Sequence, residues 1–154
     1  MNLDSLNKWL MFAANLGVIA GILFLGIEIN QNRELTKAQI RHELSQGAID
    51  TILREASDPT MAAISLKGMN DEAMTPEESL VYERLVTAWF RYIESVHYQY
   101  RNGLYDESEF SQQQNVWRQR FEIPSVVRLW CQVRQNFSAE LAEEVGALDL
   151  FQCE

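Results

Sequence analysis

The sequence predicts an all-α protein in which a single N-terminal transmembrane helix is followed by an antiparallel helical bundle. Three observations lead to this prediction. Residues 10–27 form an eighteen-residue run without a charged side chain. The rest of the chain repeats its apolar residues at helical spacing and shows no sustained period-two alternation. Each of the three prolines falls where a helix is expected to begin or end.

The apolar run, LMFAANLGVIAGILFLGI, contains one clearly polar side chain, Asn15. A helix over residues 9–29 would be about 30 Å long, which is the thickness of the hydrocarbon core of a bilayer. Trp9 at one end and Glu28 at the other suit the headgroup layers. We therefore expect this helix to cross a membrane.

This prediction divides the chain into a tail (1–8), a transmembrane helix (9–29) and a helical domain (30–154).

Two alternatives compete with the membrane span. A cleaved signal peptide needs a basic start and a small-residue cleavage site, whereas this start carries only Lys8, offset by Asp4. A buried core helix of a soluble protein is usually shorter or has a polar stripe.

Lysine and arginine near the two ends of the span predict its orientation. The N-terminal side offers Lys8 and the α-amine, and the C-terminal side offers Arg33, Lys37 and Arg41. The positive-inside rule then places the N-terminus outside the cell membrane and the remaining domain in the cytoplasm.

One face of the span carries small residues at intervals of four: Ala13, Gly17 and Gly21. Small residues at this spacing allow another membrane helix to approach closely. We expect packing against a second copy or another membrane protein, in addition to contact with membrane lipid.

The chain is acidic, with 22 acidic and 13 basic residues and a formal charge of −9. Asp4 and Lys8 cancel, so the remainder of the chain carries the whole excess. An acidic domain without a basic run is a poor candidate for binding nucleic acid or an anionic lipid surface. We expect no nucleic-acid partner.

Cys131 and Cys153 are the two cysteines of the chain. They lack the spacing of a zinc or thioredoxin-like site. In the cytoplasm they should stay reduced, and outside it they would be able to pair. The sequence leaves both states open.

The domain reads as one helix after another. We expect a helix over 34–56 that ends at Asp58-Pro59. This helix is able to continue the membrane helix through residues 30–32. A short helix over 60–68 should follow. Thr75-Pro76-Glu77-Glu78 reads as a capping box that opens a helix of residues 75–102, with Gly103 as its stop.

Three further helices are expected to start near Asp106, Pro124 and Ser138. Their apolar stripes are, in order, Phe110, Trp117 and Phe121; Val126, Trp130, Val133 and Phe137; and Leu141, Val145 and Leu148.

The helix over 75–102 has two stripes. We expect its core face to consist of Leu85, Trp89, Tyr92 and Val96. The opposite stripe consists of Glu83, Thr87, Phe90, Glu94, Tyr98 and Arg101, with His97 at its edge. The candidate polar cluster within it is Glu94, His97, Tyr98 and Arg101.

Glu94 and His97 form an E-x-x-H, the spacing with which a helix offers a carboxylate and an imidazole to one metal. Di-iron bundles use this motif twice, but the other histidine, His42, is preceded at that spacing by Gln39. We therefore expect no metal or cofactor, and interpret the cluster as a structural or surface network. A pH sensor would need His97 partly buried beside Glu94.

The segments GIEINQN, WFRYIESVHYQYRNGLYDE and PSVVRLWCQVRQNFSAEL resemble a group of uncharacterised bacterial proteins. The resemblance implies one membrane span followed by a small helical domain, and no activity. It rests on Trp89, Glu94, His97, Tyr98, Tyr100, Gly103, Trp130 and Phe137.

Phosphate-loop, G-x-S-x-G and H-E-x-x-H motifs are absent from the sequence. We therefore expect a non-enzymatic interaction or accessory module, with no catalytic residue assigned. The alternative is a membrane-tethered sensor or metal-carboxylate protein that uses the Glu94/His97 face.

Overall fold

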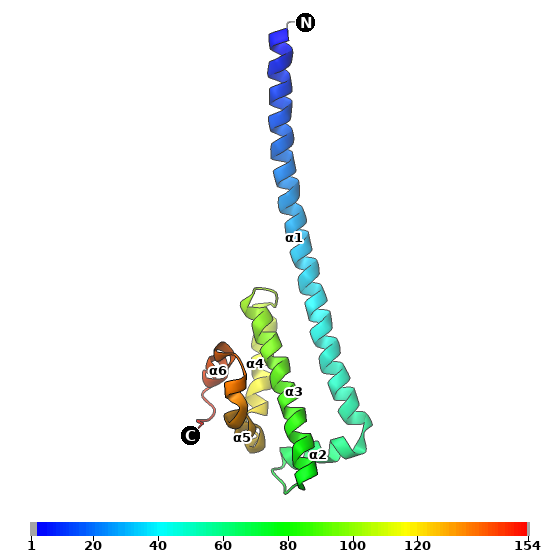
Figure 1. Cartoon of the computed structure of the whole chain (residues 1–154), viewed down its shortest axis with the longest axis vertical. Helices are drawn as coiled ribbons and strands as arrows, with labels where there is room; N and C mark the ends of the chain where they lie inside the picture. The colour runs from blue at the N-terminus through cyan, green and yellow to red at the C-terminus, as the bar shows by residue number, and fades with distance from the viewer. Residues whose placement is uncertain (1–2, 154) are drawn as a thin grey trace. The chain divides into compact units, whose positions relative to one another are not determined.

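The computed structural model describes residues 3–153, except for the side chain of Ser5, and over these residues the protein is all-helical with no strand (Figure 1). A 3₁₀ turn, Arg134–Asn136, follows the fifth helix. The six α-helices are α1 (Leu3–Ser57), α2 (Pro59–Met69), α3 (Pro76–Arg101), α4 (Glu107–Arg120), α5 (Pro124–Val133) and α6 (Ala139–Gly146).

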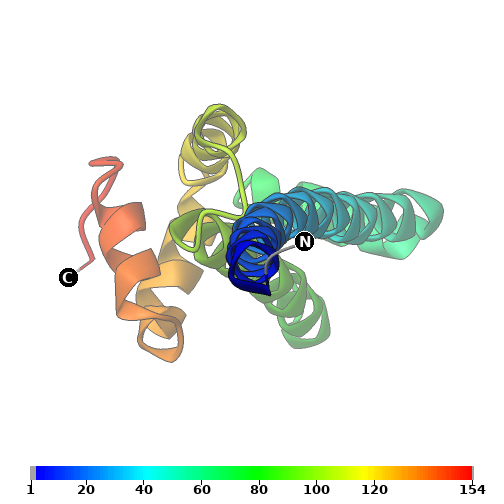
Figure 2. The same cartoon turned by 90° about the horizontal axis from the view of Figure 1, so that it is seen from above.

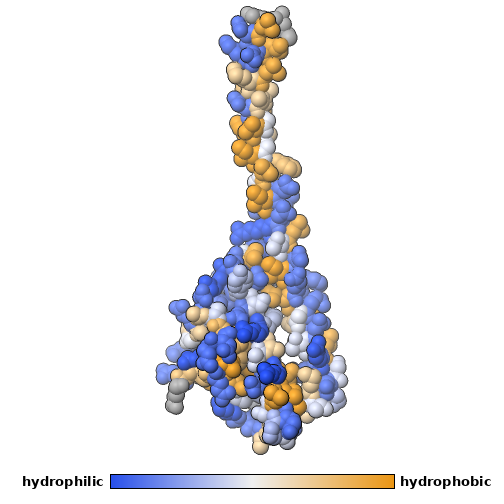
Figure 3. Space-filling view, viewed as in Figure 1, coloured by the Kyte–Doolittle hydropathy of each residue, from blue (hydrophilic) through white to orange (hydrophobic). Residues whose placement is uncertain are grey.

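The chain divides into two compact units, Met1–Gln39 and Ile40–Glu154. Helix α1 is unbroken through the polar residues 30–32 and belongs to both units. Along the first unit, apolar side chains cover much of the helix, whereas the visible face of the second unit is mostly hydrophilic (Figure 3). Among the described residues, α1 is the helix long and apolar enough to cross a membrane.

Three of the predicted start signals and the predicted stop of α3 are confirmed, whereas Asp106 precedes α4 without a side-chain capping hydrogen bond. Thr75 and Glu78 form the capping box of α3, in which the Thr75 amide donates to Glu78 (2.9 Å) and the Glu78 amide donates to Thr75 Oγ1 (3.2 Å). Gly103 follows the end of α3 with φ 68°, a left-handed conformation that glycine adopts without strain. Asp58 caps α2 by accepting from two backbone amides.

Helix α3 is the centre of the second unit and contacts α2, α4 and α5 (Figure 2). The predicted stripes of α4 and α6 are buried, as are Val126 and Trp130 of α5. The buried apolar core consists of Ile64, Tyr82, Val86, Phe90, Ile93, Val96, Phe110, Trp117, Phe121, Val126, Trp130, Leu141, Val145 and Leu148.

The predicted core face of α3 is rotated by about a quarter of a helical turn from the observed one, and Val96 is the residue common to both. The buried face consists of Tyr82, Val86, Phe90, Ile93, Val96 and His97. Leu85, Trp89 and Tyr92 are only half-buried, and Phe90, assigned to the polar stripe, is completely buried. The reason is that helices pack against α3 between its two stripes, so the centre of burial lies between them.

A hydrogen-bonded junction joins α2, α3 and α5 inside this core. The Ser125 hydroxyl donates to the Gly68 carbonyl (2.7 Å) and lies 2.8 Å from the Tyr82 hydroxyl. The ring of Tyr82 packs directly over the backbone of Gly68, where a Cβ atom would overlap it. The absence of a side chain at residue 68 is therefore what lets α2 and α3 approach at this point.

The C-terminal segment is tied to α5 by a disulfide bond between Cys131 and Cys153, whose Cα atoms are 5.4 Å apart. Asp149 turns the chain after α6 with φ 55°. The ring of Phe151 then packs on Phe121, with centroids 5.3 Å apart. Of the two cysteine states that the sequence left open, the structure has the paired one.

Candidate functional site

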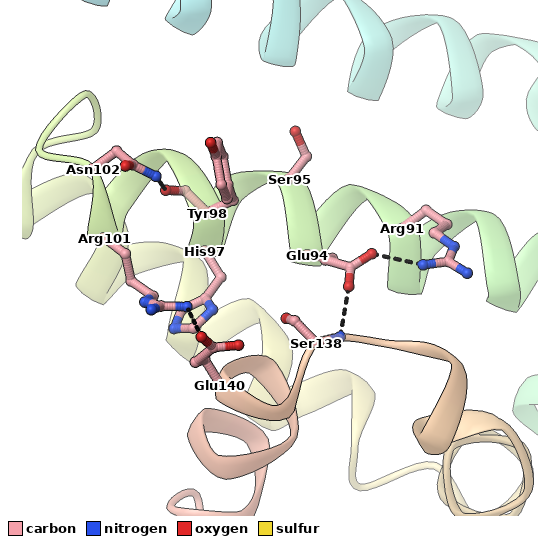
Figure 4. A pocket seen from close by; sticks show the side chains of 9 residues that line it. All are labelled: Arg91, Glu94, Ser95, His97, Tyr98, Arg101, Asn102, Ser138 and Glu140. Carbon is pink, nitrogen blue, oxygen red and sulfur yellow. Dashed lines mark hydrogen bonds and ion pairs between the residues drawn. The ribbon is translucent and has the colours of Figure 1, made fainter.

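A solvent-open hollow of about 620 Å³ lies between α3 and the start of α6 (Figure 4). The four predicted cluster residues, Glu94, His97, Tyr98 and Arg101, all line it. They share this position because residues three and four apart lie on the same side of a helix. The remaining lining residues are Arg91 and Ser95 of α3, Asn102 directly after it, and Ser138 and Glu140 at the start of α6.

Glu94 connects the two helices that form the hollow. One carboxylate oxygen accepts from the backbone amide of Ser138 (2.8 Å), and the other accepts from Arg91 Nη1 (2.7 Å). Ser138 is the N-cap of α6, and its hydroxyl accepts from the Leu141 amide. The carboxylate therefore holds the N-terminal end of α6, where a negative charge is favourable.

The two arginines of the hollow are held in place by neighbouring groups. Arg91 also donates to the Asn136 carbonyl (3.2 Å), and its guanidinium lies 4.2 Å from the centre of the Phe137 ring. Arg101 pairs with Glu140 at 3.0 Å. The backbone amide of Glu140, and then Arg101, lower the pKa of that carboxyl group. Both cations are thus positioned by contacts within the chain itself.

His97 is the buried member of the cluster, with 5% of its side chain exposed. Burial lowers its pKa, and Arg101 acts in the same direction, while Glu144 and Glu140 of α6 oppose this shift. Its Nε2 lies 3.6 Å from a Glu144 carboxylate oxygen, which is longer than an ordinary hydrogen bond. Burial therefore favours the neutral imidazole.

The E-x-x-H pair does not act as one unit. Glu94 contacts Arg91 and Ser138 (Figure 4), whereas the Nε2 atom of His97 lies near the carboxylate of Glu144 instead. Over the residues that the structure describes, no group of three or more His, Cys, Asp or Glu side chains is placed to hold a metal ion. The arrangement is that of a polar network between helices, with one face open to solvent.

Sequence reasoning missed the other lining residues for two different reasons. Arg91, Ser95 and Asn102 lie one helical turn from predicted members of the cluster, so helical spacing alone was sufficient to find them. Ser138 and Glu140 lie on another helix about forty residues away in the sequence, and no local pattern indicates that they reach α3.

Because burial lowers the pKa of His97, we expect the unfolding free energy of the protein to depend on pH. The unfolded chain takes up a proton near the ordinary histidine pKa of 6.5, whereas the folded chain takes it up only at lower pH. We expect the unfolding free energy to fall as the pH decreases below about 6.5 and to level off below the folded pKa. Urea unfolding of the detergent-solubilised protein, followed by tryptophan fluorescence, measures this.

The difference between the wild type and His97→Gln isolates this contribution from the carboxylates that titrate in the same range. The matched control is His42→Gln, because His42 is exposed. It should keep the pH dependence of the wild type between pH 5 and 7. An unchanged pH dependence in His97→Gln would contradict the role assigned to the buried imidazole.

Over residues 3–153, the fold and the hollow are those of an all-helical protein that has one candidate membrane-spanning helix and a polar network between helices. The chain matches no family model, and no curated protein or solved structure matches it either. The resemblance to bacterial proteins with one span and a helical domain stays a prediction.

Proposed function

We propose that this protein is a single-pass protein of a bacterial inner membrane whose acidic helical domain is a non-enzymatic interaction or accessory module. The antiparallel order of its helices, and its kinship with the bacterial proteins that it resembles, belong to this proposal. The observation that supports the interaction role is the exposed ring of Tyr98, which lies between Arg91 and Arg101. Both arginines already form ion pairs with glutamates of the chain.

The anchoring role is supported by the N-terminal part of α1. Its apolar side chains, among them Phe12, Ile19 and Phe24, are exposed along the helix, and none of the apolar window is buried within the structure. A core helix would bury such residues against its own chain. The hydrocarbon core of a bilayer removes these side chains from water without requiring contacts with other parts of the protein.

The interaction surface is supported by the chemistry of the hollow. Tyr98 is 61% exposed, and Arg91 and Arg101 lie on the same side of α3. Tyrosine and arginine are the residues that most often supply binding energy at protein interfaces. Because both arginines are already held by neighbouring groups, little side-chain entropy remains to be lost on binding. We therefore place the contact with a protein partner here.

Catalysis has less support from the same geometry. A general base needs a lone pair that can reach a substrate. Glu94 accepts from two donors, one of them the Ser138 amide at the start of α6. The side chain of His97 is only 5% exposed.

The membrane helix supplies a second contact in the proposal. Apart from the adjacent residues and the backbone of its own helical turns, a Cβ atom added to Gly17 or Gly21 would meet no described atom within 4 Å. Together with Ala13, these positions present a face on which the backbone of another helix can approach closely. The occupant is a second copy of the chain or another membrane protein.

Capture of partners from mild-detergent extracts, quantified by mass spectrometry, tests both contacts. Tyr98→Ala should reduce the captured amount of a protein bound by the helical domain about tenfold or more, which corresponds to a loss of about 1.4 kcal/mol in binding free energy. Gly17→Leu with Gly21→Leu should reduce self-association or capture of a membrane partner.

Two control variants match these changes. Leu80→Ala alters another exposed side chain of α3, away from the hollow. Val18→Leu with Ile22→Leu changes the shape of apolar side chains on the adjoining face and leaves the small residues in place. If the Tyr98 and glycine variants capture the same proteins in the same amounts as their controls, the interaction role is wrong.

A further inference from the structure

The disulfide bond between Cys131 and Cys153 carries information about where the domain resides. Its Cα atoms are separated by 5.4 Å, within the usual range for a bonded pair. Cys131 belongs to α5 and Cys153 to the C-terminal segment, 22 residues further along the chain. The fold therefore brings the two thiols together from separate elements.

The bond has the features of a structural crosslink rather than of a redox centre. Both cysteines are partly buried, and their spacing is not that of a C-x-x-C motif. They are also the only cysteines in the sequence, so the chain supplies no third thiol for an internal exchange reaction.

The crosslink holds the segment that follows Asp149. Over residues 150–153, the part of this segment that the structure describes, the chain has no regular secondary structure, and the ring of Phe151 packs on that of Phe121. Phe121 in turn packs on Trp130, with ring centroids 5.8 Å apart. By restricting the unfolded chain, the bond favours the state in which Phe151 covers this aromatic part of the core.

We infer that the helical domain resides in an oxidising compartment outside the cytoplasm, and that the N-terminus is consequently cytoplasmic. Disulfides form and persist in such compartments, whereas cytosolic thiol systems keep cysteines reduced. The inference concerns location and does not depend on the interaction role proposed above. Its assignment of the N-terminus does rest on the proposed membrane span.

This orientation is opposite to the one that the charge bias favours. The bias compares Lys8 and the α-amine with Arg33, Lys37 and Arg41, a difference of one positive group. On the domain side Lys37 lies 3.6 Å from Glu34, and Arg41 pairs with Glu109 at 2.6 Å. A disulfide bond forms only where an oxidant is present. It therefore indicates the compartment more specifically than a difference of one positive group does.

The redox state of the full-length protein in cells tests the inference. Thiols are trapped by acid, and the protein is then treated with a polymer-linked maleimide before or after reduction. We expect no mass shift before reduction and a shift of two maleimides after it. Cys153→Ser should take up one maleimide without reduction, which calibrates the gel. Two additions to the unreduced wild type would overturn the inference.

Reporter fusions to the wild-type chain provide an independent test that does not depend on a cysteine variant folding. A phosphatase that requires disulfides should be active after residue 154, and a fluorescent protein that folds in the cytoplasm should be fluorescent before residue 1 but dark after residue 154. Fluorescence after residue 154 would overturn the inference. Release of the protein by an alkaline carbonate wash would instead contradict the membrane span alone.

Discussion

Replacing Phe90 with alanine is expected to lower the unfolding free energy by about 3 to 5 kcal/mol, the largest effect of any single truncation considered for this protein. Phe90 is completely buried, and its ring contacts those of Trp130, Phe121 and Phe137, with centroids 5.1 to 6.0 Å apart. Removing the ring leaves a cavity that these large aromatic neighbours cannot close. Urea unfolding followed by tryptophan fluorescence measures the loss.

The informative control is Leu85→Ala, because sequence patterning assigned Leu85 to the core and Phe90 to the polar side. Leu85 is half-buried in the structure, so its truncation should cost about 1 kcal/mol. A loss at Leu85 equal to or greater than the loss at Phe90 would show that the buried face of α3 is the one predicted from the sequence.

Replacing Gly68 with alanine is expected to cost about 2 to 4 kcal/mol although it adds a single methyl group. The new Cβ atom would overlap the ring of Tyr82, which has 6% of its surface exposed. Displacing that ring would also break its hydrogen bond with Ser125, whose hydroxyl contacts the Gly68 carbonyl. Both the packing and the buried polar junction are therefore disturbed.

The control is Gly47→Ala on α1, where an added Cβ atom meets nothing within 4 Å. In an open helical position, alanine should raise stability by about 0.5 to 1 kcal/mol. A double-mutant cycle with Tyr82→Leu, read by urea unfolding, identifies the cause. If Gly68→Ala is as costly with leucine at residue 82 as with tyrosine, the clash with Tyr82 is not the reason.

Local structure was largely predictable because its signals lie close together in the sequence. The capping box of Thr75 and Glu78 and the stop at Gly103 involve residues within one turn of the helix ends. The same holds for the cluster of Glu94, His97, Tyr98 and Arg101, since helical spacing alone places them on one side of α3.

The partners of these residues were not predictable, because they come from distant parts of the chain. No local pattern indicates that Glu94 holds the amide of Ser138, or that Glu144 approaches His97. The rotation of the core face of α3 has the same origin. A helix covered by neighbours on several sides carries apolar residues beyond a single stripe, so the sequence does not indicate which of them is most deeply buried.

The sequence by itself determined that the protein is all-helical, where most of its helices start, and that one helix is apolar enough to cross a membrane. These properties follow from short-range capping, helical periodicity and side-chain transfer energies. Only the tertiary structure decided that Phe90 is central, that Gly68 must lack a side chain, and that Cys131 and Cys153 are bonded. Each of these depends on contacts between elements far apart in the chain, for which a single sequence contains no local signal.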